Sequence, residues 1–518
     1  MLNFFSHFLV QLLLSYALTV GGLVTGYRRG GIPPDASLTR SLRAGLPVLL
    51  CVIAIWNAIL GSVQTAAQRN SMVGVDLVLG ILFALSASAL IGATLARRNP
   101  ATVLERGTVL LDETETAPAA TDPDALTLAG HVIPLLDETK HFKIIGTTGS
   151  GKSTAIRELL AKALARGDRA VIADPDGGYA RRFYDASRGD VILNPFDSRS
   201  VRWDLYSEME LPQDADHLAR SFFPDCSGEE KIWRGYARTY VSSLLRQLRR
   251  NKEAQDLDRL YYLLSSAPEA DLQDLLQGTP AQRFLGKDGG RFLHSVQSTA
   301  MHHLEALEYV ARQNEGNAVC IRKWIREGKG VLFLPYSANE IASLSHLIGA
   351  WMRLAIFEAL SAKEGDQRIW FVIDELNALG AVDGLEDALT RLRKFGGRCI
   401  LGFQNIAQVR GSYGDAQSQS IVENCGCTLI LRCSASERGG TAEFASKLIG
   451  QRQIVRKQKS TSRTGWRFFG KTHTTSDHLF TEDAVMASEI EQLPDLAGFL
   501  KLPSQPQWHR VTLKHADQ

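Results

Sequence analysis

The sequence contains few cysteines, and none is spaced for metal binding. The seven are Cys51, Cys226, Cys320, Cys399, Cys425, Cys427 and Cys433. No CxxC pair occurs, which argues against a zinc domain, and the chain is far longer than disulfide-stapled domains. We therefore expect free thiols in a reducing cytoplasm, with Cys425 and Cys427 as small strand residues.

The chain also lacks a strong net charge, an internal repeat and a long low-complexity tract. The balance of 58 Lys and Arg against 56 Asp and Glu gives a formal charge of +2. Total charge therefore says little about partners, and its distribution matters more. A length of 518 residues with 45% apolar residues predicts two or three globular domains.

Long apolar runs are confined to the first hundred residues, at 8–25, 44–63 and 77–96. None contains a charged residue, and each is long enough to cross a hydrocarbon core of ~30 Å. They predict a transmembrane anchor of three helices over residues 1–98; buried soluble helices are the alternative. A cleaved signal peptide is disfavoured because the start lacks a basic segment.

Basic residues flank these runs unevenly. Arg28, Arg29, Arg40 and Arg43 lie in the first connection, Arg69 alone lies in the second, and Arg97 and Arg98 follow the third run. Because cytoplasmic loops carry the excess of Arg and Lys, the large C-terminal part is expected in the cytoplasm.

A phosphate-binding loop follows a short apolar run at residues 142–145. Residues 146–153 read GTTGSGKS, which fits GxxxxGK[ST], and a helical pattern follows at 154–165. The predicted nucleotide-binding residues are Gly146, Thr147, Thr148, Gly149, Ser150, Gly151, Lys152, Ser153 and Thr154. Loop N–H groups, the helix N-terminus and Lys152 would hold the phosphates of ATP, and Ser153 would bind Mg²⁺. A glycine-rich turn is the alternative.

Two adjacent acids end a second apolar run at residues 369–373. Five consecutive apolar residues predict a parallel strand buried on both faces, and ligands bind at the carboxyl ends of such strands. Asp374 would hold Mg²⁺ through water, and Glu375 would orient the attacking water. An acidic helix N-terminus without catalytic function is the alternative.

Strands and helices alternate on both sides of a helical interruption. Expected strands lie at residues 142–145, 170–173, 191–193, 330–335, 369–373, 398–403 and 428–431, and a long helix lies at 338–360. Between 205 and 317 the pattern is helical, at 232–251, 256–265 and 291–312. The alternation predicts an α/β fold with a mostly parallel twisted sheet. The expected parts are an anchor (1–98), a linker (99–127), a discontinuous nucleotide-binding domain (128–204 and 318–503), an all-α insertion domain (205–317) and a C-terminal tail (504–518).

The order of motifs resembles the TraG/TraD coupling proteins of conjugative type IV secretion, and the TrwB-like branch most closely. The matching segments are GTTGSGKS at 146–153, DPDG at 174–177, NPFD at 194–197, WFVIDE at 370–375, GFQN at 402–405 and LPDL at 493–496. The three expected membrane helices depart from the two-helix anchor usual in that group.

The resemblance implies a RecA-like P-loop motor that forms a homohexamer at the bacterial inner membrane. It implies ATP hydrolysis with Mg²⁺ at subunit boundaries and transport of single-stranded DNA, with double-stranded DNA as an alternative. The implied partners are relaxase and other relaxosome proteins, and inner-membrane components of the secretion channel.

Three further residues acquire roles from position or resemblance. Gln404 ends a strand expected to lie beside the strand at 369–373, where an amide could sense the γ-phosphate. Arg393 matches the family position proposed to reach a neighbour's nucleotide, and Lys140 is a weaker family-based candidate for nucleotide contact. The alternatives are a surface glutamine for Gln404 and, for Arg391, Arg393 and Lys394, a solvated basic face.

Basic and aromatic residues are interleaved near the C-terminus. The predicted DNA-binding residues are Arg452, Arg456, Lys457, Lys459, Arg463, Trp466, Arg467 and Lys471, and no acid lies among them. This composition suits phosphate contact and base stacking. A β-hairpin is expected here, with a plain solvated hairpin as the alternative.

Together these features predict a membrane-anchored, ATP-driven DNA translocase of conjugation, whose helical insertion reads the relaxase–DNA cargo. An FtsK-like pump for chromosome or plasmid DNA is one alternative, disfavoured because the sequence has no C-terminal winged-helix DNA reader and no long linker. An ATP-switched recruiter of protein cargo to a secretion channel is the other.

Overall fold

The computed structural model describes residues 103–112, 124–226, 228–251, 256–286, 289–313, 316–364, 367–436, 440–463 and 471–514, together with Val20 and Val24. Apart from these two valines, the expected membrane helices lie outside the described residues. Within the described ranges no helix is both long and apolar enough to cross a membrane. The chain divides into two compact units, one of Gly107–Arg452 with Glu482–Gln518 and one of Met1–Arg106 with Gln453–Thr481.

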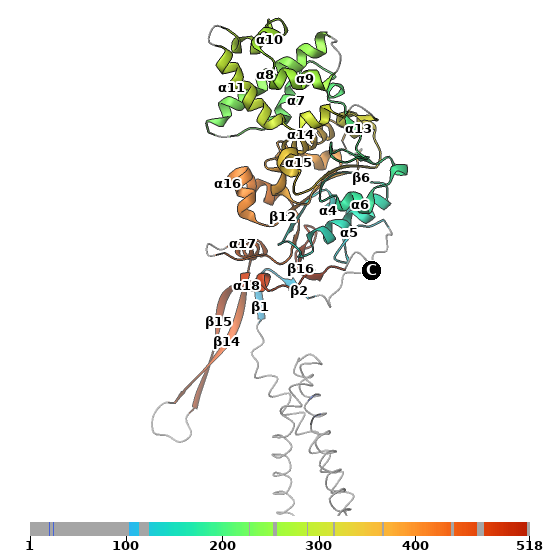
Figure 1. Cartoon of the computed structure of the whole chain (residues 1–518). Coiled ribbons are helices and arrows are strands. Elements are labelled where there is room, and N and C mark those ends of the chain that lie inside the picture. The colour runs from blue at the N-terminus through green and yellow to red at the C-terminus, as the bar shows by residue number, and fades with distance from the viewer. Residues whose placement is uncertain are drawn as a thin grey trace, which may run out of the picture. The chain divides into compact units, whose positions relative to one another are not determined.

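The larger unit is built on a ten-stranded sheet, in the order β2-β17-β16-β13-β5-β12-β11-β6-β10-β7 (Figure 1). The strands are β2 (Leu110–Leu111), β5 (Phe142–Ile145), β6 (Arg169–Pro175), β7 (Val191–Ile192), β10 (Val331–Tyr336), β11 (Ile369–Ile373), β12 (Gly397–Phe403), β13 (Cys427–Ile430), β16 (Ala497–Lys501) and β17 (Trp508–Thr512). From β13 to β7 all neighbours are parallel, whereas β16 pairs antiparallel with β13 and β17. The predicted α/β fold with a mostly parallel sheet is confirmed.

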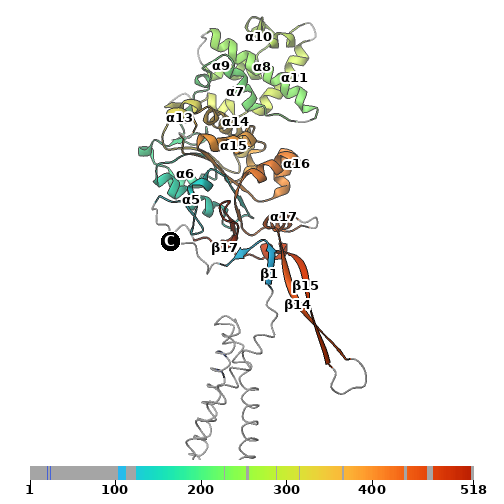
Figure 2. The ribbon, with the colours of Figure 1, turned by 180° about the vertical axis from the view of Figure 1, so that it is seen from behind.

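Helices cover both faces of this sheet (Figures 1 and 2). They are α4 (Leu135–Glu138), α5 (Lys152–Ala165), α6 (Gly178–Phe183), α13 (Ile321–Glu327), α14 (Ile341–Leu360), α15 (Leu385–Arg391), α16 (Ile406–Asn424), α17 (Gly440–Ile449) and α18 (Ala487–Glu491). Successive residues of β11 enter different cores: Phe371 and Ile373 pack with α14, and Trp370 and Val372 pack with α5. The uninterrupted apolar run of β11 therefore reflects burial on both faces.

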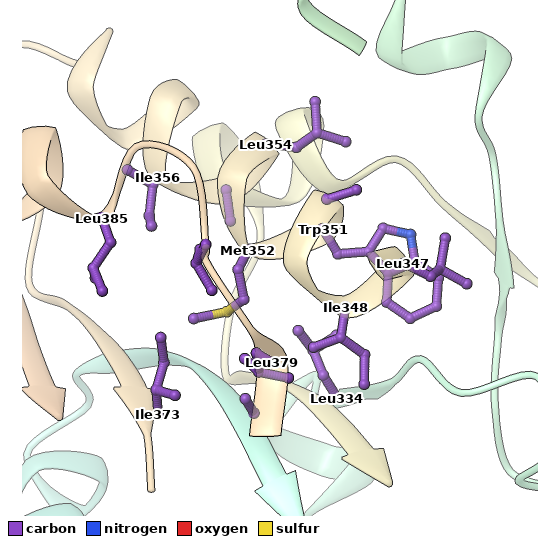
Figure 3. Packing of buried hydrophobic residues seen from close by; sticks show 14 of the residues in the cluster. Leu334, Leu347, Ile348, Trp351, Met352, Leu354, Ile356, Ile373, Leu379 and Leu385 are labelled. Atoms are coloured by element: carbon purple, nitrogen blue, oxygen red, sulfur yellow. The ribbon is translucent and has the colours of Figure 1, made fainter. Parts of the chain in front are cut away.

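The long helix α14 supplies much of one core. Figure 3 shows Ile348 and Met352 of α14 near Leu334 of β10 and Ile373 of β11, all of them buried. On its other side, the Trp351 ring lies edge-on to Trp203, with centroids 5.7 Å apart. The helix thus packs on the sheet and on the segment that leads into the helical insertion.

The insertion contains helices throughout its described part, and they lie together at one end of the larger unit (Figure 2). They are α7 (Asp214–Phe222), α8 (Glu230–Asn251), α9 (Leu257–Ser265), α10 (Glu269–Leu276), α11 (Gly289–Leu304) and α12 (Leu307–Ala311). The helical pattern expected at 291–312 corresponds to two separate helices, α11 and α12. Apolar spacing hides the break, since the buried residues Ala300, Leu304, Leu307 and Ala311 keep heptad spacing across it.

The two ends of the insertion meet in a short parallel pair of strands, β8 (Arg202–Trp203) and β9 (Ala318–Val319). Its buried residues join the same continuous core as α14 and the sheet. The insertion is therefore packed onto the sheet within one compact unit.

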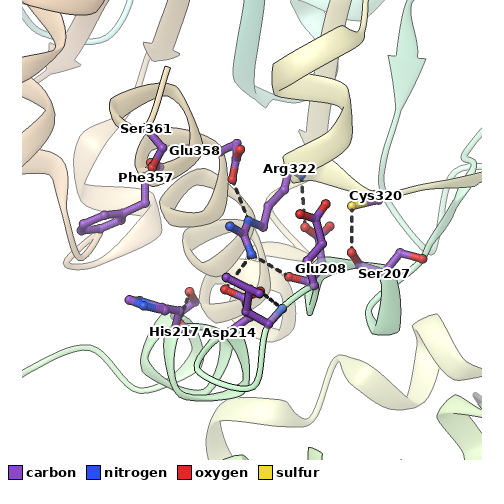
Figure 4. Close-up of polar contacts among 12 residues, drawn as sticks. Ser207, Glu208, Asp214, His217, Cys320, Arg322, Phe357, Glu358 and Ser361 are labelled. Atoms are coloured by element: carbon purple, nitrogen blue, oxygen red, sulfur yellow. Dashed lines mark hydrogen bonds and ion pairs between the residues drawn. The ribbon is translucent and has the colours of Figure 1, made fainter. Parts of the chain in front are cut away.

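Ion pairs also join the insertion to two of the helices that pack on the sheet (Figure 4). The Arg322 guanidinium of α13 lies 2.9 Å from Asp214 of α7 and 2.7 Å from Glu358 of α14. It also donates to the carbonyl of Glu208 at 2.9 Å. Because both acidic side chains are nearly buried, this arginine provides the compensation that buried carboxylates require.

The segments expected to be a linker (99–127) and a tail (504–518) contain strands, so this part of the prediction is wrong. β1 (Val103–Gly107) and β2 lie within residues 99–127, and β17 lies within residues 504–518. β17 pairs with both β16 and β2 and buries Trp508 and Val511. Strands of two to five residues, with prolines or polar segments nearby, give too short a pattern to predict.

The predicted hairpin is confirmed as the strands β14 (Gln451–Arg463) and β15 (Lys471–Asp483). They form a three-stranded sheet in the order β1-β14-β15. Most of both strands belongs to the smaller unit, rather than to the nucleotide-binding domain in which residues 318–503 were expected.

Candidate nucleotide-binding site

The predicted phosphate-binding loop lies at the carboxyl end of β5 and leads into α5, which begins at Lys152. Two neighbouring strands hold its first residues. Gly146 N–H donates to Phe403 O at 3.3 Å at the end of β12. Thr147 N–H donates to Arg432 O at 2.8 Å, just after β13. The loop therefore lies at the sheet edge where α/β proteins bind ligands.

Glycine is required at two points of this loop. A Cβ on Gly146 would lie 2.5 Å from Ser150 Oγ and 2.9 Å from Leu431 Cβ. Gly151, directly before α5, has a φ of +114°, which L side chains rarely adopt. The loop can therefore turn closely onto the first N–H groups of α5, which have no partner within the helix and favour an anion.

A cavity of about 480 Å³ opens at the loop. Its walls are Thr148, Gly149, Gly151, Lys152, Ser153, Thr154, Pro175, Asp176, Asp374, Glu375, Gln404, Asp495 and Leu496. Gly146, Thr147 and Ser150 belong to the loop but not to these walls, and the Ser150 hydroxyl donates to Thr147 O at 2.7 Å. The cavity thus brings most of the predicted loop residues together with both acids and Gln404.

The loop meets the two acids because β12 alone separates β11 from β5. The hydroxyl of Ser153 donates to Asp374 Oδ2 at 2.7 Å, although 221 positions separate the two residues. The next residue, Glu375, also lies in the wall of the cavity. The structure thus places the two residues predicted to hold Mg²⁺ in direct contact.

Gln404, directly after β12, connects the loop to the second acid. Its Nε2 donates to Glu375 Oε2 at 2.6 Å, and its Oε1 accepts from Thr148 Oγ1 at 2.8 Å. Its expected position beside the strand that leads to Asp374 is confirmed, since β12 pairs with all five residues of β11.

Burial shifts Lys152 and Glu375 toward their neutral forms. Desolvation lowers the pKa of Lys152, opposed by the negative charges of Glu375 and Asp374. Desolvation also raises the pKa of Glu375, opposed by the Gln404 hydrogen bond and by Lys152. The Lys152 ammonium donates to Gly146 O at 2.9 Å and to Thr147 O at 3.2 Å. A phosphate anion in this cavity would favour the charged form of the lysine.

The donors in the cavity suit Mg²⁺. The Ser153 hydroxyl and the Asp374 carboxylate are hard oxygen ligands that lie within hydrogen-bonding distance of each other. Among the described residues no group of three or more His, Cys, Asp or Glu side chains could hold a metal alone. Magnesium in such a site completes its shell with phosphate oxygens and water, the usual arrangement at phosphate-transfer sites.

Arg393 and Lys140 lie away from this cavity, at the opposite edge of the sheet. Exposed Arg393 precedes the amino end of β12, and Gln404 follows its carboxyl end. Lys140 precedes the amino end of β5, and its ammonium lies 2.7 Å from Asp137. Neither side chain reaches the nucleotide site of its own chain.

Of the eight predicted DNA-binding residues, the structure describes the side chain of Arg452 alone. The Arg452 guanidinium pairs with Glu482 at 2.9 Å across the hairpin strands. Arg456, Lys457, Lys459 and Arg463 belong to β14, and Lys471 begins β15. Their side chains, and the whole of Trp466 and Arg467, lie outside the described part of the structure.

Three residues in or behind the site have no role in the sequence prediction. The hydroxyl of Tyr179 donates to Asp374 Oδ2 at 2.8 Å from behind the cavity. Leu496 N–H donates to Ser150 O at 3.0 Å, and Asp495 pairs with Arg432 at 2.6 Å. Asp495 and Leu496 are the last two residues of the LPDL motif, and Tyr179 follows the DPDG motif by two residues. The motifs therefore marked these places in the sequence without indicating what the residues do.

Comparisons with known proteins agree with this geometry. The sequence model of the family described as "Type IV secretion-system coupling protein DNA-binding domain" matches residues 125–514. "Coupling protein TraD" of Escherichia coli K12 is 30% identical over 385 residues, which cover 73% of this chain and 53% of TraD. "Protein VirD4" of Agrobacterium fabrum is 26% identical over 156 residues, or 30% of this chain and 23% of VirD4. The chain thus spans about half the length of TraD and less than a quarter of the length of VirD4.

Solved structures of one relative share the fold. The "bacterial conjugative coupling protein TrwBdeltaN70" aligns with a TM-score of 0.71 and 28% identity over 80% of this chain and 94% of that one. TrwB in complex with ADP and Mg²⁺ aligns with a TM-score of 0.69 and 27% identity over 80% of this chain and 94% of that one. These likenesses bear out the resemblance to TrwB and the RecA-like α/β fold. With three quarters of its length matched by the family, the chain belongs to the type IV secretion-system coupling proteins.

Proposed function

We propose that this protein is an ATP-driven DNA translocase that couples a relaxase–DNA complex to a type IV secretion channel during conjugation. One observation carries the proposal. Lys152 and Ser153 of the loop share a cavity with Asp374, Glu375 and Gln404, which come from distant parts of the sequence. This is the set of side chains that phosphoryl transfer to water requires.

The roles of the residues follow from their positions. Loop N–H groups and Lys152 bind the β- and γ-phosphates, while Ser153 and Asp374 hold Mg²⁺, the latter through water. When bound, Mg²⁺ neutralises charge that develops on the phosphate oxygens. Glu375 orients the attacking water, and Gln404 holds the Glu375 carboxylate toward the cavity.

Nucleotide and Mg²⁺ binding gain support from relatives. TrwB structures are described as complexes with ADP and Mg²⁺, with a non-hydrolysable ATP analogue and with a GTP analogue. The cavity here, with its loop and its adjacent hydroxyl and carboxylate, suits the same class of ligand.

The proposal includes a homohexamer, which the family resemblance implies, and the position of Arg393 away from the site of its own chain supports an assembly of more than one subunit. The exposed Arg393 guanidinium, at the sheet edge opposite the cavity, is available to a neighbouring subunit. An arginine supplied in trans can raise the rate of phosphoryl transfer by ~10³ to 10⁵. Turnover would then occur at boundaries between subunits.

We further propose that residues 1–98 anchor the protein in the inner membrane by multiple spans, with the motor in the cytoplasm. The basic hairpin would contact single-stranded DNA, and double-stranded DNA remains an alternative. The helices of residues 205–317 would receive relaxosome proteins, and the membrane part would meet channel components.

The test is ATP turnover by the full-length protein in detergent, with and without single-stranded DNA. We expect turnover that depends on Mg²⁺, rises several-fold with DNA and vanishes in Lys152→Ala. DNA affinity should fall by ~0.7 in log K per neutralised phosphate for each unit of log salt. Turnover that DNA never stimulates, even at low salt, would contradict the translocase and favour the recruiter of protein cargo.

A further inference from the structure

The turn after β6 reaches the metal-holding carboxylate from behind the cavity. Asp176 and Gly177 have φ values of +56° and +61° at the start of α6. The buried Asp174 carboxylate accepts Tyr179 N–H at 2.9 Å and Ala180 N–H at 2.7 Å. The carboxylate thereby caps the helix and fixes the backbone from which the Tyr179 side chain projects.

The hydroxyl of Tyr179 contacts the same oxygen as the loop serine. Tyr179 Oη donates to Asp374 Oδ2 at 2.8 Å, and Ser153 Oγ donates to that oxygen at 2.7 Å. Two donors from different elements thus hold one carboxylate oxygen, at the end of β11. The tyrosine is only 1% exposed, so no water replaces it as a donor in this arrangement.

The Tyr179 ring also lies near a basic side chain of α5. The Arg157 guanidinium lies 5.8 Å from the centre of the ring. The side chain is thus packed between the Arg157 guanidinium of α5 and the Asp374 carboxylate that follows β11.

We propose that Tyr179 is a positioning residue for the magnesium site, holding Asp374 in the orientation that binds Mg²⁺ with nucleotide. The proposal rests on the nucleotide site proposed above. Without Tyr179, Asp374 Oδ2 would be held by Ser153 alone and would lose that contact once the Ser153 hydroxyl turns to the metal. Tyr179 does not face the cavity, so it keeps its contact with Asp374 when metal binds.

The test compares Tyr179→Phe with the unmodified full-length protein. Removing one oxygen leaves the ring packing intact but takes a donor from Asp374. Mn²⁺ serves as the probe, titrated in the presence of ADP and followed by electron paramagnetic resonance. Loss of an outer-shell partner of a metal ligand typically weakens metal binding 10- to 100-fold. We expect a shift of about this size, with ADP affinity in EDTA unchanged within about twofold.

A matched control is Tyr240→Phe. This buried tyrosine also donates one short hydrogen bond, to Leu263 O at 2.6 Å, but it lies in the helical insertion. It should lose a similar amount of stability and leave Mn²⁺ binding unchanged. If Tyr179→Phe does not fold, Asp174→Asn serves instead: it loosens the cap while keeping the hydroxyl, and it should weaken Mn²⁺ binding in the same direction by less.

Equal Mn²⁺ affinity in Tyr179→Phe and the unmodified protein would overturn the inference and leave the tyrosine a core residue. That result differs from a failure of the proposed function, in which the unmodified protein itself would take up neither ADP nor metal.

Discussion

The side-chain amide of Gln404 donates to the Glu375 carboxylate at 2.6 Å, which joins the ends of β12 and β11. The same side chain accepts from Thr148 of the loop and lines a second cavity of about 680 Å³ beside the starts of α16 and α17. One residue therefore contacts the loop, the acid and the region beyond the site. Such contacts are what a relay needs if loss of the γ-phosphate is to move other elements.

Gln404→Ala should slow ATP turnover without preventing nucleotide binding. Loss of a hydrogen bond to a charged group is worth about 1.5 to 3 kcal/mol, which corresponds to a roughly 10- to 150-fold fall in kcat. The measurement is steady-state turnover together with equilibrium binding of a fluorescent ADP analogue. Gln408→Ala, in the wall of the second cavity only, is the control and should keep near-normal turnover. Normal kcat in Gln404→Ala would remove the glutamine from the mechanism.

Glu375→Gln should trap ATP on the protein. The amide keeps the size of the side chain but cannot orient and accept a proton from water, so turnover should fall by at least ~10²-fold. Bound ATP is measured by chromatography after rapid desalting, and Lys152→Ala is the comparison that should retain none. Turnover at the unmodified rate would show that Glu375 does not position the water.

The central elements of the fold could be predicted from sequence because each has a strong local pattern. The apolar run of β11 and the GTTGSGKS loop mark both halves of the nucleotide site, and their meeting follows from parallel topology. The roles of Tyr179 and Leu496 could not be predicted, because each depends on a long-range contact to Asp374 or Ser150. The edge strands β2 and β17 are too short for a periodic pattern to be recognised.

Mixing two inactive variants tests whether Arg393 acts on a neighbour. In mixtures of Arg393→Ala with Lys152→Ala, some subunit boundaries would combine an intact loop with an intact arginine. Partial recovery of ATP turnover is expected, measured across mixing ratios with DNA present. Arg391→Ala is the control, because exposed Arg391 lies two residues away and pairs only loosely with Asp387 at 3.9 Å; it should be active alone. An absence of recovery would make the role of Arg393 structural.

Arg322→Met should destabilise the junction between the helical insertion and the sheet. The buried Asp214 carboxylate would lose the guanidinium with which it pairs. Glu358 would still have an ion pair with Arg326, at 3.5 Å. Breaking a buried pair from one side costs about 3 kcal/mol or more. Arg312→Met removes an exposed pair with Glu308 on α12 and should cost less than about 1 kcal/mol. The denaturant midpoint of each variant is measured by tryptophan fluorescence. Equal midpoints for Arg322→Met and Arg312→Met would contradict a stabilising role for Arg322 at this junction.

Asp174 should make stability depend on pH between about 4 and 6. Burial raises its pKa from 3.8 to about 6, although the N–H groups of Tyr179 and Ala180 act in the opposite direction and Asp374 adds to the rise. Well below pH 3.8 the carboxyl is protonated in both the folded and the unfolded chain. As pH rises from 4 to 6, the unfolded chain loses this proton first, so the folded state binds more protons and stability falls.

The fall attributable to Asp174 is at most about 3 kcal/mol, since one unit of pKa corresponds to about 1.4 kcal/mol. Asp174→Asn cannot titrate at this position, so it isolates the contribution from the other acids. We therefore expect the unfolding free energy of the unmodified protein minus that of Asp174→Asn to decrease as pH rises from 4 to 7. Denaturant unfolding at half-unit pH intervals measures this difference. A difference that grows with pH would mean that the helix-capping hydrogen bonds, rather than burial, dominate the ionisation of Asp174.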